Sequence, residues 1–319
     1  MIGPVLPCLR MGPLHIRTPV WSRQIGAALV HFKMDALQPV GSFKLRGIGR
    51  LCTHAKSSGA QRLVTSSGGN AGCAMAYAAR CLGLPALVYV PSRTSEMMRA
   101  KIVEQGAEVR VAGDVWDETD AAARAAAAEP TSFYVHPFEH PEVWRGHATL
   151  IEELHEQIPR PDAIVLSVGG GGLLAGVLGG MDSVGWGEVP VLAAETHGAA
   201  SLAASLSAGE LVTLESITTI ATTLGAKRVS PEALARAQAH LLTPLQMSDA
   251  DAVRACLRFA NEQRVLVEPS CGAALSLVYD RAEALAGARS IAVIVCGGAA
   301  IDLQLLASYC RRFELPTPW

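Results

Sequence analysis

Residues Ala163-Ile-Val-Leu-Ser-Val-Gly-Gly-Gly-Gly172 decide the fold of this chain. The first six are apolar or small, which is typical of a strand buried on both faces of a sheet. Four consecutive glycines follow, and the run of small residues after them predicts a helix. A strand that turns through glycine into a helix is half of a strand–helix–strand unit, so this stretch predicts a parallel sheet.

The same pattern occurs three times earlier in the chain. Short strands are predicted at 63–66, 86–90 and 108–111. Helices are predicted to follow them at about 71–82, 95–105 and 117–128. Three strand–helix units in series imply a small parallel sheet with right-handed crossovers.

A second series begins after a predicted loop at 134–142. Its strands are expected at 163–168, 190–194 and 290–296, and two of its helices at 231–241 and 248–263. The chain is therefore expected to be an α/β protein with two domains, each a parallel-rich twisted sheet flanked by helices. We expect a small domain over 39–142 and a large cofactor-binding domain from 1–38 and 143–319.

Composition excludes several classes of protein. Half of the 319 residues are apolar, but no uninterrupted apolar span reaches the roughly 18–20 residues of a membrane helix. A net charge of −2 gives no reason to expect nucleic acid. The eight cysteines form no CxxC pair, and the amino terminus lacks a secretion signal, so we expect free thiols and a cytoplasmic protein. Prolines beside His136 and His140 argue against a metal site there.

One lysine has unusual surroundings, in Pro39-Val-Gly-Ser-Phe-Lys-Leu-Arg46. Phe43 and Leu45 flank Lys44, so part of its environment should be dry. Desolvation disfavours the ammonium form, and an amine with a lowered pKa can form a Schiff base with a carbonyl. The alternative is a structural lysine at the start of a helix.

The glycines of Gly169–Gly172 let the backbone turn its N–H groups toward an anion, and a phosphate is the ligand we expect. The alternative is a tight turn that needs glycine for packing. No Gly-Lys-Ser/Thr follows, which excludes a Walker A loop. Glu195 lies where a Rossmann fold would place its ribose-binding carboxylate, but that interpretation leaves Lys44 unexplained.

A second strand-to-helix turn, Ser66-Ser-Gly-Gly-Asn-Ala-Gly72, offers hydroxyls, backbone N–H groups and one amide. It could hold a carboxylate while Asn70 contacts a polar group of a cofactor, or it could be an ordinary N-capping turn. A reactive lysine, a phosphate site and a carboxylate site together match what is needed to hold pyridoxal 5′-phosphate with an amino acid attached.

At this point the chain resembles the fold-type-II pyridoxal-phosphate enzymes, and most closely their serine/threonine dehydratase (L-serine ammonia-lyase) branch. The resemblance begins at His15-Ile-Arg-Thr-Pro19 and implies a tryptophan-synthase-β-like fold. Six motifs carry it in order: Gly41-Ser-Phe-Lys-Leu-Arg-Gly47, Ser66-Ser-Gly-Gly-Asn-Ala-Gly72, Ser167-Val-Gly-Gly-Gly-Gly-Leu-Leu174, Glu195-Thr-His-Gly-Ala199, Glu268-Pro-Ser-Cys-Gly272 and Val295-Cys-Gly-Gly298.

The resemblance implies a role for each motif. Lys44 forms the Schiff base with the cofactor, Phe43 packs against its ring, and Asn70 bonds the ring hydroxyl. Cys296 stands at the position that faces the pyridine nitrogen. The phosphate is held by the backbone amides of Gly169, Gly170, Gly171, Gly172 and Leu173. The substrate carboxylate is received by the loop of Ser67, Gly68, Gly69 and Ala71.

The resemblance also implies a monovalent cation, for which potassium is expected. Its ligands are the carboxylate of Glu195 and the carbonyls of Gly169, Ala199, Leu224 and Ala226. Apart from the resemblance, Glu195 could form an ion pair with a lysine or arginine. We expect instead that its neighbours offer only carbonyls, which suits a hard cation.

The implied activity is α,β-elimination of L-serine, and of L-threonine, to pyruvate or 2-oxobutanoate and ammonia, with Lys44 as the base at the α-carbon. A neutral thiol at Cys296 favours elimination over transamination. Gly68 offers no proton donor for racemisation, and the room it is expected to leave favours serine with some threonine activity. The alternatives are a β-replacing synthase or threonine synthase of the same fold and, outside enzymes, a nucleotide-binding regulatory protein. The family pattern implies a homodimer.

Overall fold

The computed structural model describes residues 12–316, which fold into two compact α/β units. The first unit comprises the described part of Met1–Ile16, Gln38–Val40 and Lys44–Gly146. The second comprises Arg17–Leu37, Gly41–Phe43 and the described part of His147–Trp319. The chain passes from the second unit back to the first between Phe43 and Lys44, so the lysine motif contributes residues to both units.

The first unit is built on a four-stranded parallel sheet with the order β5-β4-β3-β6. Its strands are β3 (Arg62–Thr65), β4 (Ala86–Val90), β5 (Glu108–Val111) and β6 (Ser132–Tyr134). Its helices are α1 (Lys44–Ser57), α2 (Asn70–Leu82), α3 (Glu96–Glu104) and α4 (Trp116–Ala127). Val64 and Leu87 of the sheet pack with Ala123 of α4 in the core. A short loop of residues 66–69 leads from the end of β3 to the start of α2.

The second unit is built on a six-stranded sheet with the order β1-β2-β10-β7-β8-β9. Only β1 pairs antiparallel, with β2, and every other pair is parallel. Its strands are β1 (Val20–Ile25), β2 (Ala28–Lys33), β7 (Ala163–Ser167), β8 (Val191–Thr196), β9 (Leu242–Met247) and β10 (Ser290–Ile294). Every residue of β7 and β8 is buried, as expected for strands covered on both faces.

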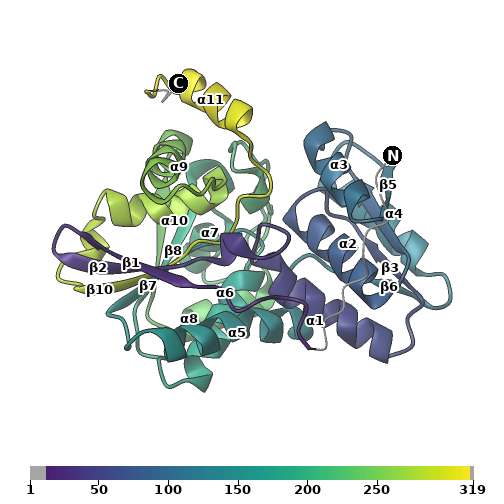
Figure 1. The fold of residues 1–319 in the computed structure, drawn as a ribbon, viewed down its shortest axis with the longest axis horizontal. Coiled ribbons are helices and arrows are strands. Elements are labelled where there is room, and N and C mark those ends of the chain that lie inside the picture. Colours follow the sequence, from purple (N-terminus) through teal and green to yellow (C-terminus); the bar gives the residue numbers. More distant parts are fainter. Residues whose placement is uncertain (1–11, 317–319) are drawn as a thin grey trace. The chain divides into compact units, whose positions relative to one another are not determined.

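Helices cover both faces of this sheet: α9 and α10 lie on one side and α5, α6 and α8 on the other (Figure 1). The α-helices of this part of the chain are α5 (Pro141–Gln157), which begins in the first unit, α6 (Gly172–Ser183), α7 (Ser201–Ala208), α8 (Pro231–Ala239), α9 (Asp249–Gln263), α10 (Pro269–Tyr279) and α11 (Leu303–Arg312). Short 3-10 helices are η1 (Asp35–Leu37), η2 (His197–Ala199), η3 (Thr222–Leu224) and η4 (Glu283–Leu285).

Side-chain caps explain where several helices begin. Ser230 accepts a hydrogen bond from the backbone N–H of Ala233 at the start of α8. Ser248 and Asp251 form a reciprocal capping box at the start of α9. Asp302 caps α11 by a single bond, as Ser230 does for α8: its side chain accepts a hydrogen bond from the N–H of Leu305. Each cap satisfies backbone donors that have no partner within the first turn.

The predicted fold class is confirmed: two mostly parallel sheets are flanked by helices. The strands predicted at 86–90 and 108–111 are those observed, and α2, α3 and α4 lie within a residue or two of their predicted ranges. The predicted loop at 134–142 starts inside β6 and overlaps the first turn of α5. Within residues 12–316, no helix is both long and apolar enough to cross a membrane.

Candidate active site

Lys44 is the first residue of α1, and its side chain is half-buried. Its Nζ atom donates a hydrogen bond of 2.8 Å to the carbonyl oxygen of Pro137. The following residues Leu45 and Arg46 are completely buried. The predicted dry surroundings of this lysine are therefore present on the side that faces the protein.

The residues before Lys44 are fixed to the end of β10. Ser42 pairs with Gly297 in an isolated antiparallel bridge, and the N–H of Phe43 donates to the carbonyl of Cys296 at 2.8 Å. Gly41, which directly precedes Ser42, has a positive φ of 74°, a backbone conformation that favours glycine. The ring centroid of Phe43 lies 4.9 Å from that of His147. The backbone of the residues just before Lys44 is thus held in place by hydrogen bonds to the segment that follows β10.

The loop of Ser67, Gly68 and Gly69 connects the end of β3 to α2, which begins at Asn70. Gly69 N–H donates to the hydroxyl of Ser67 at 3.3 Å, and Asn70 and Ala71 are buried. A Cβ atom at Gly72 would lie 1.9 Å from the carbonyl oxygen of Ser67, so only glycine at this position allows the loop to lie so close to α2. The start of a helix with several backbone N–H groups suits a carboxylate.

The room expected beside Gly68 is not there. A Cβ atom at this position would lie 2.4 Å from Oγ1 and 2.7 Å from Cγ2 of Thr94. The expectation was wrong because Thr94 comes from the segment before α3, which the motif itself does not reveal. Thr94 therefore occupies the space that a larger residue at 68 would need.

The glycine loop Gly169–Gly172 lies between β7 and α6, and α6 begins at Gly172. Gly171 caps the helix with a positive φ of 86°, and a Cβ there would lie 2.4 Å from that of Ala233. A Cβ on Gly169 would lie 2.9 Å from the Cα of Leu224. Gly169 and Gly171 must therefore be glycine for packing, and the backbone amides of the loop and of the helix start are suited to an anion. Leu173 is buried in the first turn.

Cys296 follows β10 and is buried. A hydrogen bond with the thiol of Cys271 and then burial raise the pKa of the Cys296 thiol well above its ordinary value. This thiol is therefore neutral at pH 7. None of the seven cysteines of residues 12–316 is in a disulfide, and Cys8 lies outside the described residues.

Glu195 lies on β8 and is completely buried. Its two carboxylate oxygens accept hydrogen bonds of 2.8 Å from the N–H groups of Leu202 and Ala203, at the start of α7. Burial raises the pKa of Glu195 to about 7, although these two bonds lower it. The expectation that only carbonyls surround this carboxylate was wrong, because two backbone amides bind it. The alternative of an ion pair is not observed, since no lysine or arginine of residues 12–316 pairs with it.

The other residues implied for a cation are on the same unit. Ala199 is buried in η2, and Leu224 is the last residue of η3. The carbonyl of Leu224 accepts from Ala226 N–H at 2.7 Å. Each carboxylate oxygen of Glu195 keeps a second lone pair beyond its amide bond. These oxygen atoms are of the kind that binds a hard cation.

An unpartnered polar atom lies in the lysine motif. Within residues 12–316, the hydroxyl of Ser42 is buried and has no hydrogen-bond partner. Such groups are rare, and a bound ligand is one way to satisfy them. The second unit thus combines a glycine loop at a helix start with an unused hydroxyl and a neutral thiol. These residues fit a phosphorylated cofactor that carries a ring.

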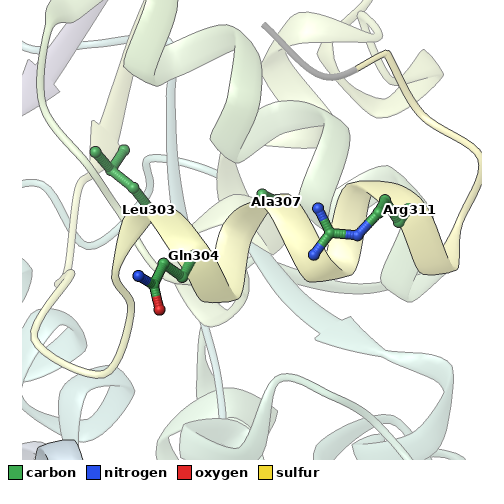
Figure 2. A pocket seen from close by; sticks show the side chains of 4 residues that line it. All are labelled: Leu303, Gln304, Ala307 and Arg311. Carbon is green, nitrogen blue, oxygen red and sulfur yellow. The ribbon is translucent and has the colours of Figure 1, made fainter. Parts of the chain in front are cut away.

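A cavity of about 510 Å³ lies elsewhere, against α11. Figure 2 shows the side chains that line it. They are Leu303, Gln304, Ala307 and Arg311. None of the predicted site residues lines this cavity, so it is no part of the candidate active site.

The chain belongs to the family described as pyridoxal-phosphate dependent enzyme, whose model matches residues 8–297. Human L-serine dehydratase/L-threonine deaminase is 45% identical over 309 residues, 92% of this chain and 94% of that protein. A human serine dehydratase-like protein is 43% identical over 325 residues, 97% and 99% of the two chains. The crystal structure of a fungal L-serine ammonia-lyase from Rhizomucor miehei superimposes with a TM-score of 0.90 at 37% identity and covers 94% of this chain and 99% of that one. The family expected from the motifs is confirmed.

Proposed function

We propose that this enzyme eliminates water from L-serine and releases pyruvate and ammonia, with L-threonine as a second substrate that yields 2-oxobutanoate. One observation carries the proposal within the structure. The carbonyl of Cys296, whose thiol is neutral, holds the amide of Phe43, and Phe43 is followed by Lys44. The human relative is a serine dehydratase/threonine deaminase and the fungal one an L-serine ammonia-lyase, which supports the same reaction and the same two amino acids.

Pyridoxal phosphate, when bound, withdraws electrons from the α-carbon of the amino acid attached to it. We assign its binding to the residues that the resemblance implies, which are Phe43, Lys44, Asn70, Gly169–Leu173 and Cys296. A thiol with a raised pKa adds no negative charge at its position. A carboxylate there would hold a proton on a facing ring nitrogen, which Cys296 does not do.

Lys44 has the second role of a base. When its amine is not bonded to the cofactor, the Pro137 carbonyl accepts one of its hydrogens at 2.8 Å. That bond restricts the amine, so that its lone pair has fewer orientations in which to take a proton. The loop of Ser67, Gly68, Gly69 and Ala71 supplies the donors for the substrate carboxylate.

Serine is the expected preferred substrate because the fungal relative is an L-serine ammonia-lyase and the human relatives are named as serine dehydratases or serine dehydratase-like. The space beside Gly68 no longer supports this preference, since Thr94 fills it. One methyl group in a pocket is worth roughly 1–3 kcal/mol, so threonine should be slower and not excluded. We also propose a potassium ion at Glu195, a homodimer and a cytoplasmic location, as the resemblance implies. Sedimentation at several protein concentrations tests the dimer.

The proposed function is tested by measuring keto-acid release from L-serine, L-threonine and their D-forms with the cofactor-loaded enzyme. We expect release from L-serine above L-threonine, and little from either D-form. Addition of a thiol nucleophile should not divert L-serine to a β-substituted product. Diversion of most of the serine to such a product would identify a synthase and contradict the proposal.

A further inference from the structure

A hydrogen-bonded cluster lies behind the Ser67 loop in the first unit. The hydroxyl of Ser66 donates to Oδ1 of Asp120 at 2.7 Å and lies 2.8 Å from the hydroxyl of Tyr134. Tyr134 also donates to Oδ1 of Asp120. Nε of Arg124 donates to the other oxygen, Oδ2, at 2.6 Å. One carboxylate therefore joins three side chains from β6, α4 and the end of β3.

The cluster is linked to the loop through the backbone, because Ser66 directly precedes Ser67. Ser66 is completely buried. On its other side, the hydroxyl of Thr65 donates to the carbonyl of Val135 at 2.7 Å. The chain is thus held on both β6 and α4 immediately before the loop begins. A shift of Ser66 would move Ser67 with it.

The charges of the cluster are balanced. Burial raises the pKa of Asp120, but hydrogen bonds from Tyr134, Arg124 and Ser66 outweigh it and hold the pKa below its ordinary value. The carboxylate is therefore ionised at neutral pH. The guanidinium of Arg124 compensates this charge and also lies 4.4 Å from the ring centroid of Tyr134. An ionised acceptor strengthens each hydrogen bond it receives.

We propose that Asp120 and Tyr134 are positioning residues, which fix the Ser67 loop through Ser66 and so set the affinity for the carboxylate of the amino-acid substrate. The proposal rests on the proposed function, because that function assigns the loop to the carboxylate. The carboxylate keeps its charge throughout the reaction, so its contacts are made equally in the ground state and the transition state. Loss of such contacts raises KM and leaves kcat unchanged.

The test compares Asp120→Asn and Tyr134→Phe with a matched control, Asp117→Asn, which changes an exposed acid on the same helix. Each test variant removes hydrogen bonds worth about 1–3 kcal/mol, so KM for L-serine should rise about five- to a hundredfold. We expect kcat within about twofold of the parent, since uniform binding does not change it. The control should leave both constants unchanged.

A second measurement does not depend on turnover. Glycine has no β-hydroxyl to lose, and methylamine is glycine without its carboxylate. Titration of the visible absorption of the loaded enzyme should show that both test variants weaken glycine and leave methylamine unchanged. Amide hydrogen exchange at 67–71 should accelerate, and the melting temperature of the cofactor-free protein should fall by roughly 2–10 °C, because the lost hydrogen bonds are present in the free enzyme.

Two outcomes would overturn the proposal. One is an equal loss of affinity for glycine and methylamine, and the other is a fall in kcat and in melting temperature with KM unchanged. Failure of the proposed function gives a different result. In that case the parent enzyme releases no keto acid from serine or threonine, while the comparison of glycine with methylamine still reports on the loop.

Discussion

The backbone N–H of Phe43 donates a hydrogen bond of 2.8 Å to the carbonyl of Cys296. These residues belong to two motifs that lie near opposite ends of the sequence. Gly298 N–H donates back to the carbonyl of Gly41 at 2.9 Å, so the two segments are joined on both sides. The three residues before Lys44 are therefore held against the end of β10, next to the neutral thiol of Cys296.

The contact between Thr94 and the Gly68 position predicts a coupled effect of substitutions. Gly68→Ala should destabilise the enzyme by about 1–3 kcal/mol, because its Cβ would overlap both branches of Thr94. Thr94→Ala removes those two atoms, and the double variant should regain much of the loss. Urea unfolding of the four proteins gives the coupling energy. Additive effects would show that Thr94 does not limit the residue at 68.

The neutral state of His136 predicts a dependence of stability on pH. Burial, and then the charge of Arg124, lower the pKa of His136 to about 4, and its Nδ1 accepts from Phe138 and Glu139 N–H at 3.3 and 2.9 Å. A folded-state pKa below the ordinary value of about 6.5 gives stability that is present above pH 6.5 and is lost as pH falls through 4. The full loss is about 3 kcal/mol.

His136→Asn keeps an acceptor for the two amides and removes the titration. Its free energy of unfolding should fall less than that of the parent between pH 7 and 4. His54→Asn, at an exposed position, is the control and should keep the parental slope. Parallel pH profiles for His136→Asn and the parent would mean that His136 does not remain neutral in the fold.

The proposed cation predicts that activity depends on the monovalent ion. Glu195 is a buried carboxylate that accepts hydrogen bonds from two backbone amides and pairs with no lysine or arginine of residues 12–316, so a bound cation would balance its charge. Activity should fall when tetramethylammonium replaces potassium or ammonium, and Glu195→Gln should weaken this dependence. Equal rates in all buffers, at matched ionic strength and saturating cofactor, would remove the cation from the account.

Much of the fold follows from local patterns in the sequence. Strands such as β4 and helices such as α2 are continuous apolar or alanine-rich runs bounded by glycine or proline, and these were predicted within a residue or two. β1 was missed because half of Val20-Trp-Ser-Arg-Gln-Ile25 is polar, without a regular alternation, and the segment becomes a strand by pairing with β2. The composition of that segment carries no signal of its partner.

Residues of the candidate site could be predicted where they belong to one distinctive sequence motif. They could not be predicted where they come into contact only through the tertiary fold. Lys44 and the glycine loop stand out by their neighbours in sequence. Thr94, Asp120 and Pro137 do not, since each acts across a tertiary contact. Pro137 contributes only a backbone carbonyl, which every residue has. Asp120 lies in an alanine-rich helix that resembles any exposed helix.

The central claim is that Lys44 bonds the cofactor and takes the proton, and one paired measurement on Lys44→Ala tests it most directly. The visible absorption of the purified, cofactor-loaded protein and keto-acid release from L-serine are measured together. Lys56→Ala is the matched control, because Lys56 lies on the same helix and donates one hydrogen bond of 2.6 Å to the carbonyl of Leu82. We predict that Lys44→Ala loses both the visible band and turnover, while the melting temperature of its cofactor-free form equals that of the parent. Lys56→Ala should keep both the band and turnover. Substantial keto-acid release by Lys44→Ala would contradict the account.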